Sequence, residues 1–390
     1  MAWQPTWSRR TFLRWAGTTA VSALSLPLIP HLAAFSPQAA RLEKWPPNSN
    51  VIIEWRYLAG RITTASEDIG FVISISFIRL PGGVRQELLV QRQDLAGDGA
   101  FVGSTYGGTL TYDAATAGYT FVDETAVSAL NWRWDESQQQ YTLSLSSPEL
   151  TLTNLTLRPQ GDLIAEGGDG QISVGRAQGV PIASNYDADW VTIWQNGSEV
   201  GVARLDMQGL RPDFLRQQPN AVQDVEPGGY DHSWFALVGE LANGTAVWLS
   251  TWRIEDDVSG PYWVATVATG SGASWQIAAS LTESSSATPL QVRELAWQPL
   301  PDASSDQRAA TAWHIIAPNN TFDLTLRTPP GQFTLSPRGA DVLGQPFMVE
   351  AVGASASGTV LGQPLTNVKL VVAESTHEFY TEMLPLVVKK

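Results

Sequence analysis

The feature that most constrains the fold is a succession of short stretches in which strand-forming residues alternate with polar ones. Ile52–Ile62 and Ile69–Arg79 are two such stretches, and others recur as far as Leu365–Val372, separated by clusters of Gly, Asp and Ser. No segment longer than about ten residues follows a helical period of 3.6 residues. Strands that follow one another without helical crossovers pair antiparallel. The sequence therefore predicts an all-β protein of antiparallel β-barrel or sandwich domains with few, short helices.

Asn-Gly dipeptides predict two hairpins within this pattern. Asn196-Gly197 and Asn243-Gly244 each separate two runs of strand-forming residues. Asn-Gly favours a two-residue type I′ turn, because that turn requires positive φ at both central positions. In the second hairpin, such a turn places Ala242 opposite Thr245 and so fixes the pairing of the whole ladder.

That register defines a candidate site on one face of the second hairpin. It sets His232 opposite Glu255 and Trp234 opposite Arg253, with all four side chains on one face. The face offers a histidine–carboxylate pair and a cation over an indole ring, while Trp248 is expected in the apolar core on the opposite face. The alternative is a solvated face with two ordinary cross-strand pairs. A three-residue loop would shift the register by one residue and separate these side chains.

The first 40 residues are typical of a twin-arginine signal peptide. Ser8–Arg14 contains paired arginines followed by Phe and Leu, and an apolar segment rich in Thr and Ala follows. Cleavage is expected near Ala34 or Ala40, with an uncleaved anchor as the alternative. The sequence predicts export by the twin-arginine translocase to the periplasm, the extracellular space or the cell envelope.

Charge and residue usage exclude several kinds of chemistry. Removal of the signal, which holds three arginines and no acidic residue, leaves 21 basic against 38 acidic residues. This negative charge argues against nucleic acid as a partner. The absence of Cys excludes disulfides and thiolate catalysis. His232, His314 and His377 are the histidines outside the signal and show no metal-binding spacing, so we expect neither a metal nor another cofactor.

A chain of 390 residues is long enough for two domains. Gln, Pro, Asn and Gly concentrate just before the Gly228-Gly229-Tyr230-Asp231-His232 stretch. We therefore expect an N-terminal domain over 46–225 and a C-terminal domain over 229–385. A motif at such a junction is well placed to line a cleft between domains.

Four motifs, in order, resemble the AttH/CrtC-like family, whose named enzyme is carotenoid 1,2-hydratase. The motifs are Glu54–Gly60, Gly70–Ser74, Asp231–Trp234 and a final group made of Thr311–Ile315, Phe322–Thr325 and Glu350–Gly358. The resemblance covers essentially the whole chain after the signal and extends more distantly to the fungal Diels–Alderases. It implies two lipocalin-like β domains and an apolar pocket.

In the hydratase, the resemblance implies addition of water to a terminal C=C bond. An acid protonates the alkene, and water captures the resulting carbocation. Such a site needs a carboxylic acid held protonated by apolar surroundings, aromatic faces and a base for the water. His232 and Trp234 fall on the family's His-x-Trp motif. The family's return strand carries a Tyr and an Asp that Trp248–Arg253 lacks, and Glu255, Asp256 or Asp257 could substitute.

These observations lead to a catalytic set and a ligand-binding set. The catalytic candidates are His232, Trp234, Glu255, Asp257 and Asp231, and the ligand-binding candidates are Trp55, Tyr57, Tyr230, Arg253 and Trp252. The first hypothesis is an enzyme that hydrates, isomerises or cyclises a hydrophobic alkene or isoprenoid. The alternatives are a non-catalytic carrier of a lipid or terpenoid and a structural envelope protein. Glu54 is expected to pair with Arg56 or Arg79, and the oligomeric state is left open.

Overall fold

The computed structural model describes residues 53–80, 83–96, 101–168, 170–177, 180–210, 231–255, 262–270, 275–283, 285–299, 308–328, 334–336, 348–353 and 355–376. For some strand ends, among them Asp231, His232, Ile254 and Glu255, the description extends to the backbone alone. The predicted signal over 1–40, the predicted junction before residue 229, Tyr230 and Asp257 lie outside the described residues, and the domain boundaries stay predictions.

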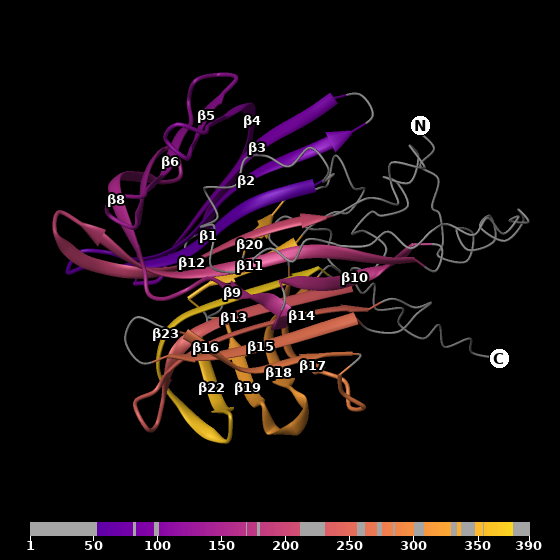
Figure 1. The fold of residues 1–390 in the computed structure, drawn as a ribbon. Helices are drawn as coiled ribbons and strands as arrows, with labels where there is room; N and C mark the ends of the chain where they lie inside the picture. Colours follow the sequence, from indigo (N-terminus) through magenta and orange to yellow (C-terminus); the bar gives the residue numbers. More distant parts are fainter. Residues whose placement is uncertain are drawn as a thin grey trace, which may run out of the picture. The chain divides into compact units, whose positions relative to one another are not determined.

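The first sheet closes on itself as a ten-stranded barrel (Figure 1). The strand order is β11-β12-β1-β2-β3-β4-β5-β6-β7-β8, and the barrel closes where β8 pairs with β11 from Val191↔Pro159 to Trp194↔Thr156. Its strands are β1 (Ile53–Thr63), β2 (Asp68–Leu80), β3 (Gly83–Asp94), β4 (Phe101–Asp113), β5 (Gly118–Asp123), β6 (Ala129–Asp135), β7 (Gln140–Ser146), β8 (Thr151–Pro159), β11 (Val180–Gln195) and β12 (Ser198–Leu210). Two further strands, β9 (Ile164–Ala165) and β10 (Gln171–Ala177), pair with β11 outside this circuit.

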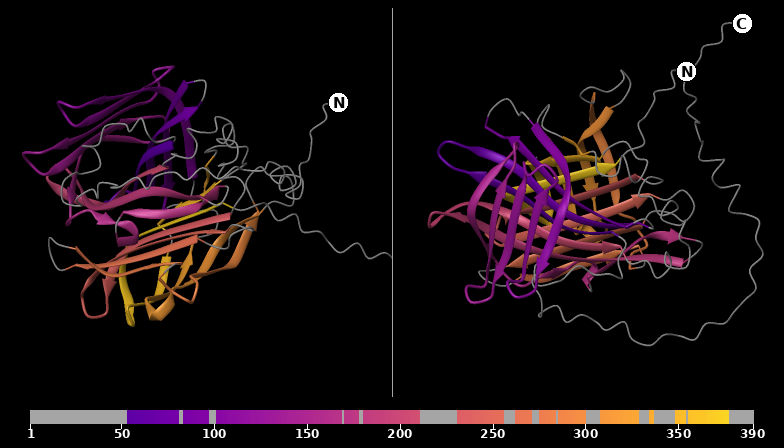
Figure 2. Two further views of the ribbon diagram at one scale, coloured as in Figure 1. Left: turned by 45° about the vertical axis from the view of Figure 1, so that its right-hand side comes forward. Right: turned by 90° about the horizontal axis from the view of Figure 1, so that it is seen from above.

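The second sheet is a half-barrel, whose strands are coloured orange to yellow in Figure 2. Its order is β16-β15-β14-β13-β23-β22-β19-β18-β17, with β21 on β23 and β20 on β21. The bounds are β13 (Asp231–Leu241), β14 (Ala246–Glu255), β15 (Tyr262–Gly270), β16 (Trp275–Thr282), β17 (Gln291–Pro299), β18 (Arg308–Ile316), β19 (Phe322–Arg327), β20 (Thr334–Ser336), β21 (Met348–Val352), β22 (Ser355–Val360) and β23 (Gln363–Thr376).

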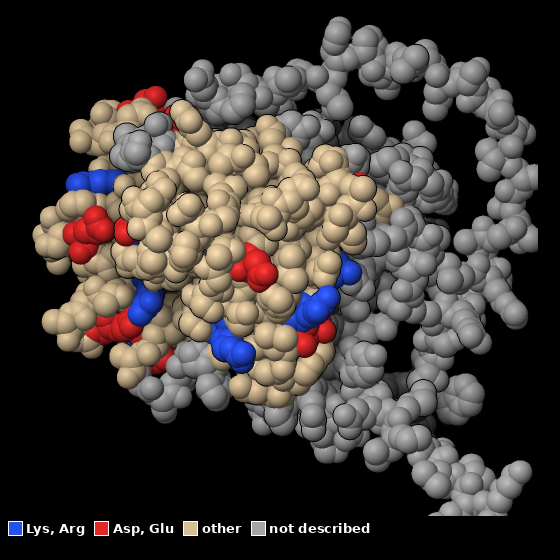
Figure 3. Space-filling model, turned by 90° about the horizontal axis from the view of Figure 1, so that it is seen from below, with Lys and Arg blue, Asp and Glu red and all other residues tan. Residues whose placement is uncertain are grey.

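The prediction of an all-β fold with two lipocalin-like sheets is confirmed. Strands make up 76% of the structure, and short 3₁₀ turns occur at Glu166–Gly168 (η2) and Pro318–Asn320 (η4). No helix among the described residues is long and apolar enough to cross a membrane. The face in Figure 3 carries scattered Lys, Arg, Asp and Glu side chains on a largely uncharged surface.

The two Asn-Gly hairpins form different turns. Asn196 and Gly197 both have positive φ, and Gln195 pairs directly with Ser198, as a two-residue type I′ turn requires. At the second hairpin, Gly244 has positive φ but Asn243 does not, and Leu241 N–H donates to the Thr245 carbonyl. This loop therefore has three residues, and the predicted two-residue turn is wrong. The Asn243 side chain accepts a hydrogen bond from Thr245 N–H at 3.0 Å, which holds Asn243 outside the left-handed region.

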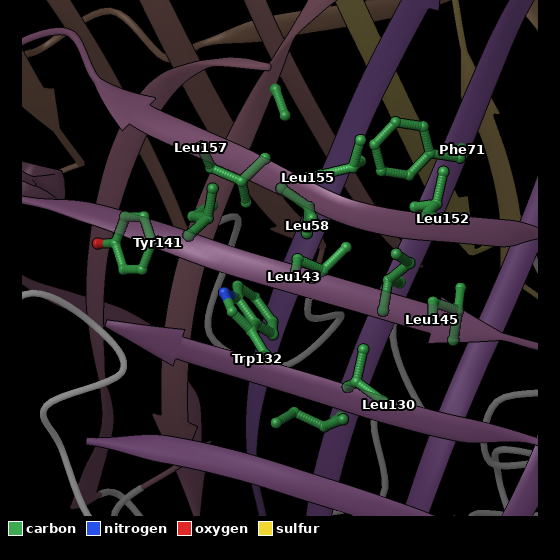
Figure 4. Packing of buried hydrophobic residues seen from close by; sticks show 14 of the residues in the cluster. Leu58, Phe71, Leu130, Trp132, Tyr141, Leu143, Leu145, Leu152, Leu155 and Leu157 are labelled. Carbon is green, nitrogen blue, oxygen red and sulfur yellow. The ribbon is translucent and has the colours of Figure 1, made fainter. Parts of the chain in front are cut away.

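The barrel interior is filled by side chains. Trp132, Tyr141 and leucines from β6, β7 and β8 converge on Leu58 and Phe71 (Figure 4). This interior also holds a buried ion pair: Arg56 donates to Glu54 at 3.0 Å and lies 4.7 Å over the Tyr119 ring. The expected pairing of Glu54 with arginine is confirmed.

Two further apolar clusters complete the packing. One fills the concave side of the half-barrel and contains residues such as Phe235, Leu249 and Trp313. The other joins the two sheets and is called the inter-sheet cluster here. It consists of Tyr57, Ala59, Val72, Leu89, Ile164, Ala188, Trp190, Trp234, Ala236, Val238, Trp248, Val264, Ala268, Val352, Leu370 and Val372, with Trp55, Val202, Trp252 and Trp275 partly buried against it.

Candidate functional site

A buried arginine lies at the centre of the inter-sheet cluster. Arg204 is on β12, where Ala203 and Leu205 on either side face the barrel interior. The alternation of a strand therefore directs Arg204 to the outside of the barrel. There its guanidinium lies 4.7 Å from the ring centre of Trp234 and 5.1 Å from that of Trp248. Both tryptophans come from the second sheet, so the cation is held against aromatic faces of the opposite sheet.

Glu166 forms a short ion pair with this arginine. Arg204 Nη2 donates to Glu166 Oε1 at 2.8 Å, and both side chains are fully buried. Glu166 follows β9, whose pairing with β11 at Ala188 anchors the turn. Gly167 and Gly168 then adopt positive φ, and Gly167 N–H donates to Thr266 Oγ1 on β15 at 3.1 Å. The turn thus inserts a carboxyl group of the first sheet against the hydroxyl groups of the second.

Burial raises the pKa of Glu166 from its ordinary value of 4.5 to about 7. Loss of hydration is the largest cause, because it penalises the charged form. The Arg204 charge and the nearby Ser250 and Thr266 hydroxyls lower the pKa in part, while the Asp206 charge raises it further. Neither hydroxyl gives a well-directed hydrogen bond to Oε2, which is buried without such a partner. Glu166 is consequently an acid with a pKa near neutral pH. Because Oε1 accepts the hydrogen bond from Arg204, Oε2 is the oxygen that carries the proton.

Asp206 is the second carboxyl group beside the arginine. It lies two residues along β12 from Arg204 on the same face, and Arg204 Nη2 is 3.5 Å from Asp206 Oδ2. Tyr57 is directly opposite Asp206 in the ladder with β1 and meets Trp234 edge-on, with ring centres 5.7 Å apart. The site therefore combines two carboxyls, one guanidinium and three aromatic rings. Chemically, it can deliver and recover a proton in apolar surroundings.

The raised pKa of Glu166 predicts a pH-dependent stability. Between pH 4.5 and about 7 the folded protein holds a proton that the unfolded chain has released, so the free energy of unfolding falls as pH rises through this window. The contribution is complete below about pH 4.5 and amounts to about 3 kcal/mol. Urea unfolding at pH 5 and pH 8 measures it. Glu166→Gln should remove this part of the slope, and an equal slope in both proteins would contradict the assignment.

The glycine turn gives a second prediction. Gly168 has φ +93°, and a Cβ there would lie 3.3 Å from Ser280 Oγ. Gly168→Ala should cost about 1–2 kcal/mol of stability, because L-residues avoid this backbone region, and should also displace Glu166. Gly197→Ala is the matched control, since Gly197 has φ +81° with open space around it. Both variants should unfold at lower urea concentration, but Gly168→Ala alone should change the titration of Glu166. Equal titrations would show that the turn does not position the acid.

The structure brings four of the predicted site residues to the inter-sheet cluster. Trp234 and Tyr57 are buried in it, and Trp55 and Trp252 are partly buried against it. Trp234 pairs with Trp252 across the β13–β14 ladder, and Ala236 with Ser250. Trp248, which was expected on the opposite face, lies in this cluster with them.

The predicted register of the β13–β14 hairpin is wrong by one residue. The three-residue loop sets Asp231 opposite Glu255, His232 opposite Ile254 and Ser233 opposite Arg253. His232 and Glu255 are therefore not directly opposed, and Trp234 is not opposed to Arg253. The ladder gives Arg253 the opposite orientation to Trp252 on its strand. The side chains of Asp231, His232 and Glu255 are outside the description, so their catalytic roles stay predictions. The catalytic role of Asp257 and the ligand-binding role of Tyr230 stay predictions too.

Three charged residues of the site were not predicted from the sequence. Arg204 and Asp206 had a signal, since charges at i and i+2 in an apolar strand indicate either a solvated face or a buried ion cluster. Glu166 had a weaker one, a single carboxylate before Gly167-Gly168. Its contact with Arg204 depends on the pairing of β9 with β11. A strand of two residues is too short to be predicted from the sequence pattern.

The fold and the site together define a lipocalin-like β protein with a buried acid between two sheets. No family profile and no curated protein matches the chain. Among solved structures it resembles a putative AttH protein from Nitrosomonas europaea, with 17% identity, a TM-score of 0.58, and coverage of 90% of this chain and 99% of that one. It also resembles kievitone hydratase from Nectria haematococca, with 15% identity, a TM-score of 0.55 and coverage of 88% and 94%. The chain shares their fold, in agreement with the AttH-like resemblance of its motifs.

Proposed function

We propose that the protein is a lipocalin-like enzyme that uses Glu166 as a general acid on a C=C bond of a hydrophobic, isoprenoid-like ligand. The observation that carries the proposal is the buried Glu166 carboxyl with a pKa of about 7. An acid is most effective when its pKa lies near the working pH. The shared fold with a protein named as a hydratase supports the class of chemistry.

The contacts of Glu166 suit the proton transfer. Arg204 donates to Oε1, so the proton resides on Oε2 and leaves from there to the alkene carbon. The carboxylate that remains is stabilised by the guanidinium at 2.8 Å. The cation formed on the ligand is stabilised by aromatic faces, for which the nearby rings are Trp234, Trp248 and Tyr57. Water then adds to the cation and gives up a proton.

His232 is the proposed acceptor of that proton. It lies two residues before Trp234 on β13, and a neutral imidazole accepts a proton near pH 7. In the balanced step, one proton passes from Glu166 to carbon, the water oxygen bonds to the adjacent carbon, and one proton passes to His232. Return of that proton to Glu166 through solvent completes the addition of one water molecule. Isomerisation or cyclisation would share the first step and lose a proton from carbon instead.

The test combines extraction with turnover. Apolar compounds extracted from the purified native protein are identified by mass spectrometry, and the protein is then incubated with acyclic carotenoids in ¹⁸O-labelled water. The expected product is heavier by one labelled water, or is an isomer of the substrate, and forms more slowly with His232→Ala. Retention of an unaltered lipid without turnover would replace the enzyme with a carrier. Isolation of the protein from the exported fraction, and its loss there on Arg9→Lys/Arg10→Lys substitution, tests the proposed twin-arginine export.

A further inference from the structure

The tip of the β11–β12 hairpin leaves its polar groups unbonded. Asn196 and Gly197 form the two-residue turn, both are exposed, and the ladder closes with the pairing of Gln195 and Ser198. Among the described residues, the Asn196 carboxamide and the Gly197 N–H have no hydrogen-bond partner. A Cβ built on Gly197 would meet no atom within 4 Å. The carboxamide and the peptide nitrogen that follows it therefore lie in water without a competing contact.

The tip of the β13–β14 hairpin holds the same dipeptide by two hydrogen bonds. Gly244 N–H donates to the Leu241 carbonyl at 2.8 Å. Thr245 N–H donates to the side-chain oxygen of Asn243 at 3.0 Å. Asn243 and Gly244 are as exposed as the residues of the first turn, so the two turns differ in bonding and not in access to water.

We infer that Asn196 is a site of spontaneous deamidation in the folded protein and that Asn243 is protected by its turn. The Gly197 nitrogen bonds to the side-chain carbonyl carbon of Asn196, and the bond from that carbon to the side-chain nitrogen breaks. The proton lost by the Gly197 nitrogen balances the proton gained by the departing group, which leaves as ammonia. One water molecule then opens the cyclic imide and gives aspartate or isoaspartate at position 196. The chemistry is independent of the proposed role of Glu166.

Glycine favours this attack, because it places no side chain beside the attacking nitrogen. Both Asn-Gly steps share that advantage, so the hydrogen bonds of the second turn decide between them. Deprotonation of Gly244 N–H requires release of its bond to Leu241, as does hydrogen exchange of any bonded amide. Rotation of the Asn243 carboxamide toward that nitrogen requires release of its bond to Thr245. Each bond should slow the reaction by about 5-fold, and the two together by at least about 10-fold.

The two products differ in their effect on the hairpin. Aspartate at position 196 adds a negative charge but tolerates positive φ, so the type I′ turn should persist. Isoaspartate carries the backbone through the side-chain carbon and lengthens a turn that has only two residues. The pairing of Gln195 with Ser198 should then open, which exposes their amides to hydrogen exchange.

Ageing of the purified full chain at mildly alkaline pH tests the inference. Peptides that contain each Asn-Gly step are quantified by mass spectrometry, with isoaspartate separated from aspartate by chromatography. In the folded protein, Asn196 should deamidate at least about 10-fold faster than Asn243. The same measurement in urea is the matched control: unfolding releases both turns, and the two rates should become similar.

Three results would overturn the inference. The first is equal rates at the two sites in the folded protein, or a faster rate at Asn243. The second is an Asn196 that survives in the folded protein while it deamidates in urea, since the type I′ turn itself would then prevent the attack. The third is hydrogen exchange of Gly197 N–H that is as slow as that of Gly244 N–H. Asn196→Asp supplies the aspartate product directly and should retain the exchange rate of Ser198 N–H, whereas protein enriched in isoaspartate should exceed it.

Discussion

Glu166→Gln should reduce kcat/KM by about 100-fold or more, the range that a positioned general acid contributes. Glutamine retains the shape of the side chain, and its carbonyl oxygen can still accept the hydrogen bond that Arg204 donates to Oε1. It cannot release a proton from the position of Oε2. Since burial penalises the charged form of Glu166, which predominates above about pH 7, the substitution should preserve or increase stability near pH 8. Loss of activity without loss of stability is the expected signature, measured by initial rates and urea unfolding on the same preparation.

Glu54→Gln is the matched control for that experiment. Glu54 is also a buried carboxylate paired with arginine, at 3.0 Å from Arg56, but it lies inside the barrel and away from the inter-sheet cluster. Its replacement should lower stability and leave turnover intact. Equal rates for wild-type protein and Glu166→Gln would remove Glu166 from the chemistry. Equal losses in both variants would point to a general effect of buried charge.

Arg204→Met should destabilise the protein by about 3–5 kcal/mol at pH 8, the cost of removing one partner from a buried ion cluster. Methionine fills similar volume between Trp234 and Trp248, so the loss reports the two carboxyls left without their guanidinium. At pH 5 the loss should be smaller, because Glu166 is protonated there. Urea unfolding at both pH values measures the difference.

Two comparisons establish the cause of that loss. Arg158→Met removes a cation 4.0 Å from the ring centre of Trp194, but at an exposed position, and should cost no more than about 1 kcal/mol. Adding Glu166→Gln and Asp206→Asn to Arg204→Met should recover part of the stability, since none of these three positions then carries a buried charge. A loss below 1 kcal/mol in Arg204→Met, or no recovery in the triple variant, would show that the ion cluster does not hold the sheets together.

The sequence was sufficient for the fold class because short strands and turn residues are local signals. The Asn196-Gly197 turn, for example, requires only two residues and formed as predicted. The same dipeptide at Asn243-Gly244 formed a longer loop, because the side chain of Asn243 bonds to the Thr245 backbone instead. A difference of one loop residue then moved every pairing of the β13–β14 ladder by one.

Burial on both faces concealed the site from pattern analysis. The first seven residues of β15, Tyr262–Ala268, are all buried, because one face of the strand belongs to the half-barrel core and the other to the inter-sheet cluster. Such strands lack the alternation that separates an inner from an outer face. Trp248, on β14, was assigned to the wrong face because the predicted two-residue turn shifted the register by one residue. The sequence did not identify Glu166 as a partner of Arg204, because Glu166 is 38 residues away in the chain and belongs to a turn.

The inter-sheet cluster also has a consequence for the order of events during synthesis. Residues 53–210 leave the ribosome first, and Tyr57, Trp190 and Arg204 on the outside of the barrel have no cover until β13–β15 follow. During that interval Glu166 is hydrated and behaves as an ordinary, ionised side chain. Docking of the late strands expels this water and makes the carboxyl take up a proton. The acid is therefore created by the last stage of assembly, and a nascent or separated N-terminal half is expected to be inert and prone to self-association.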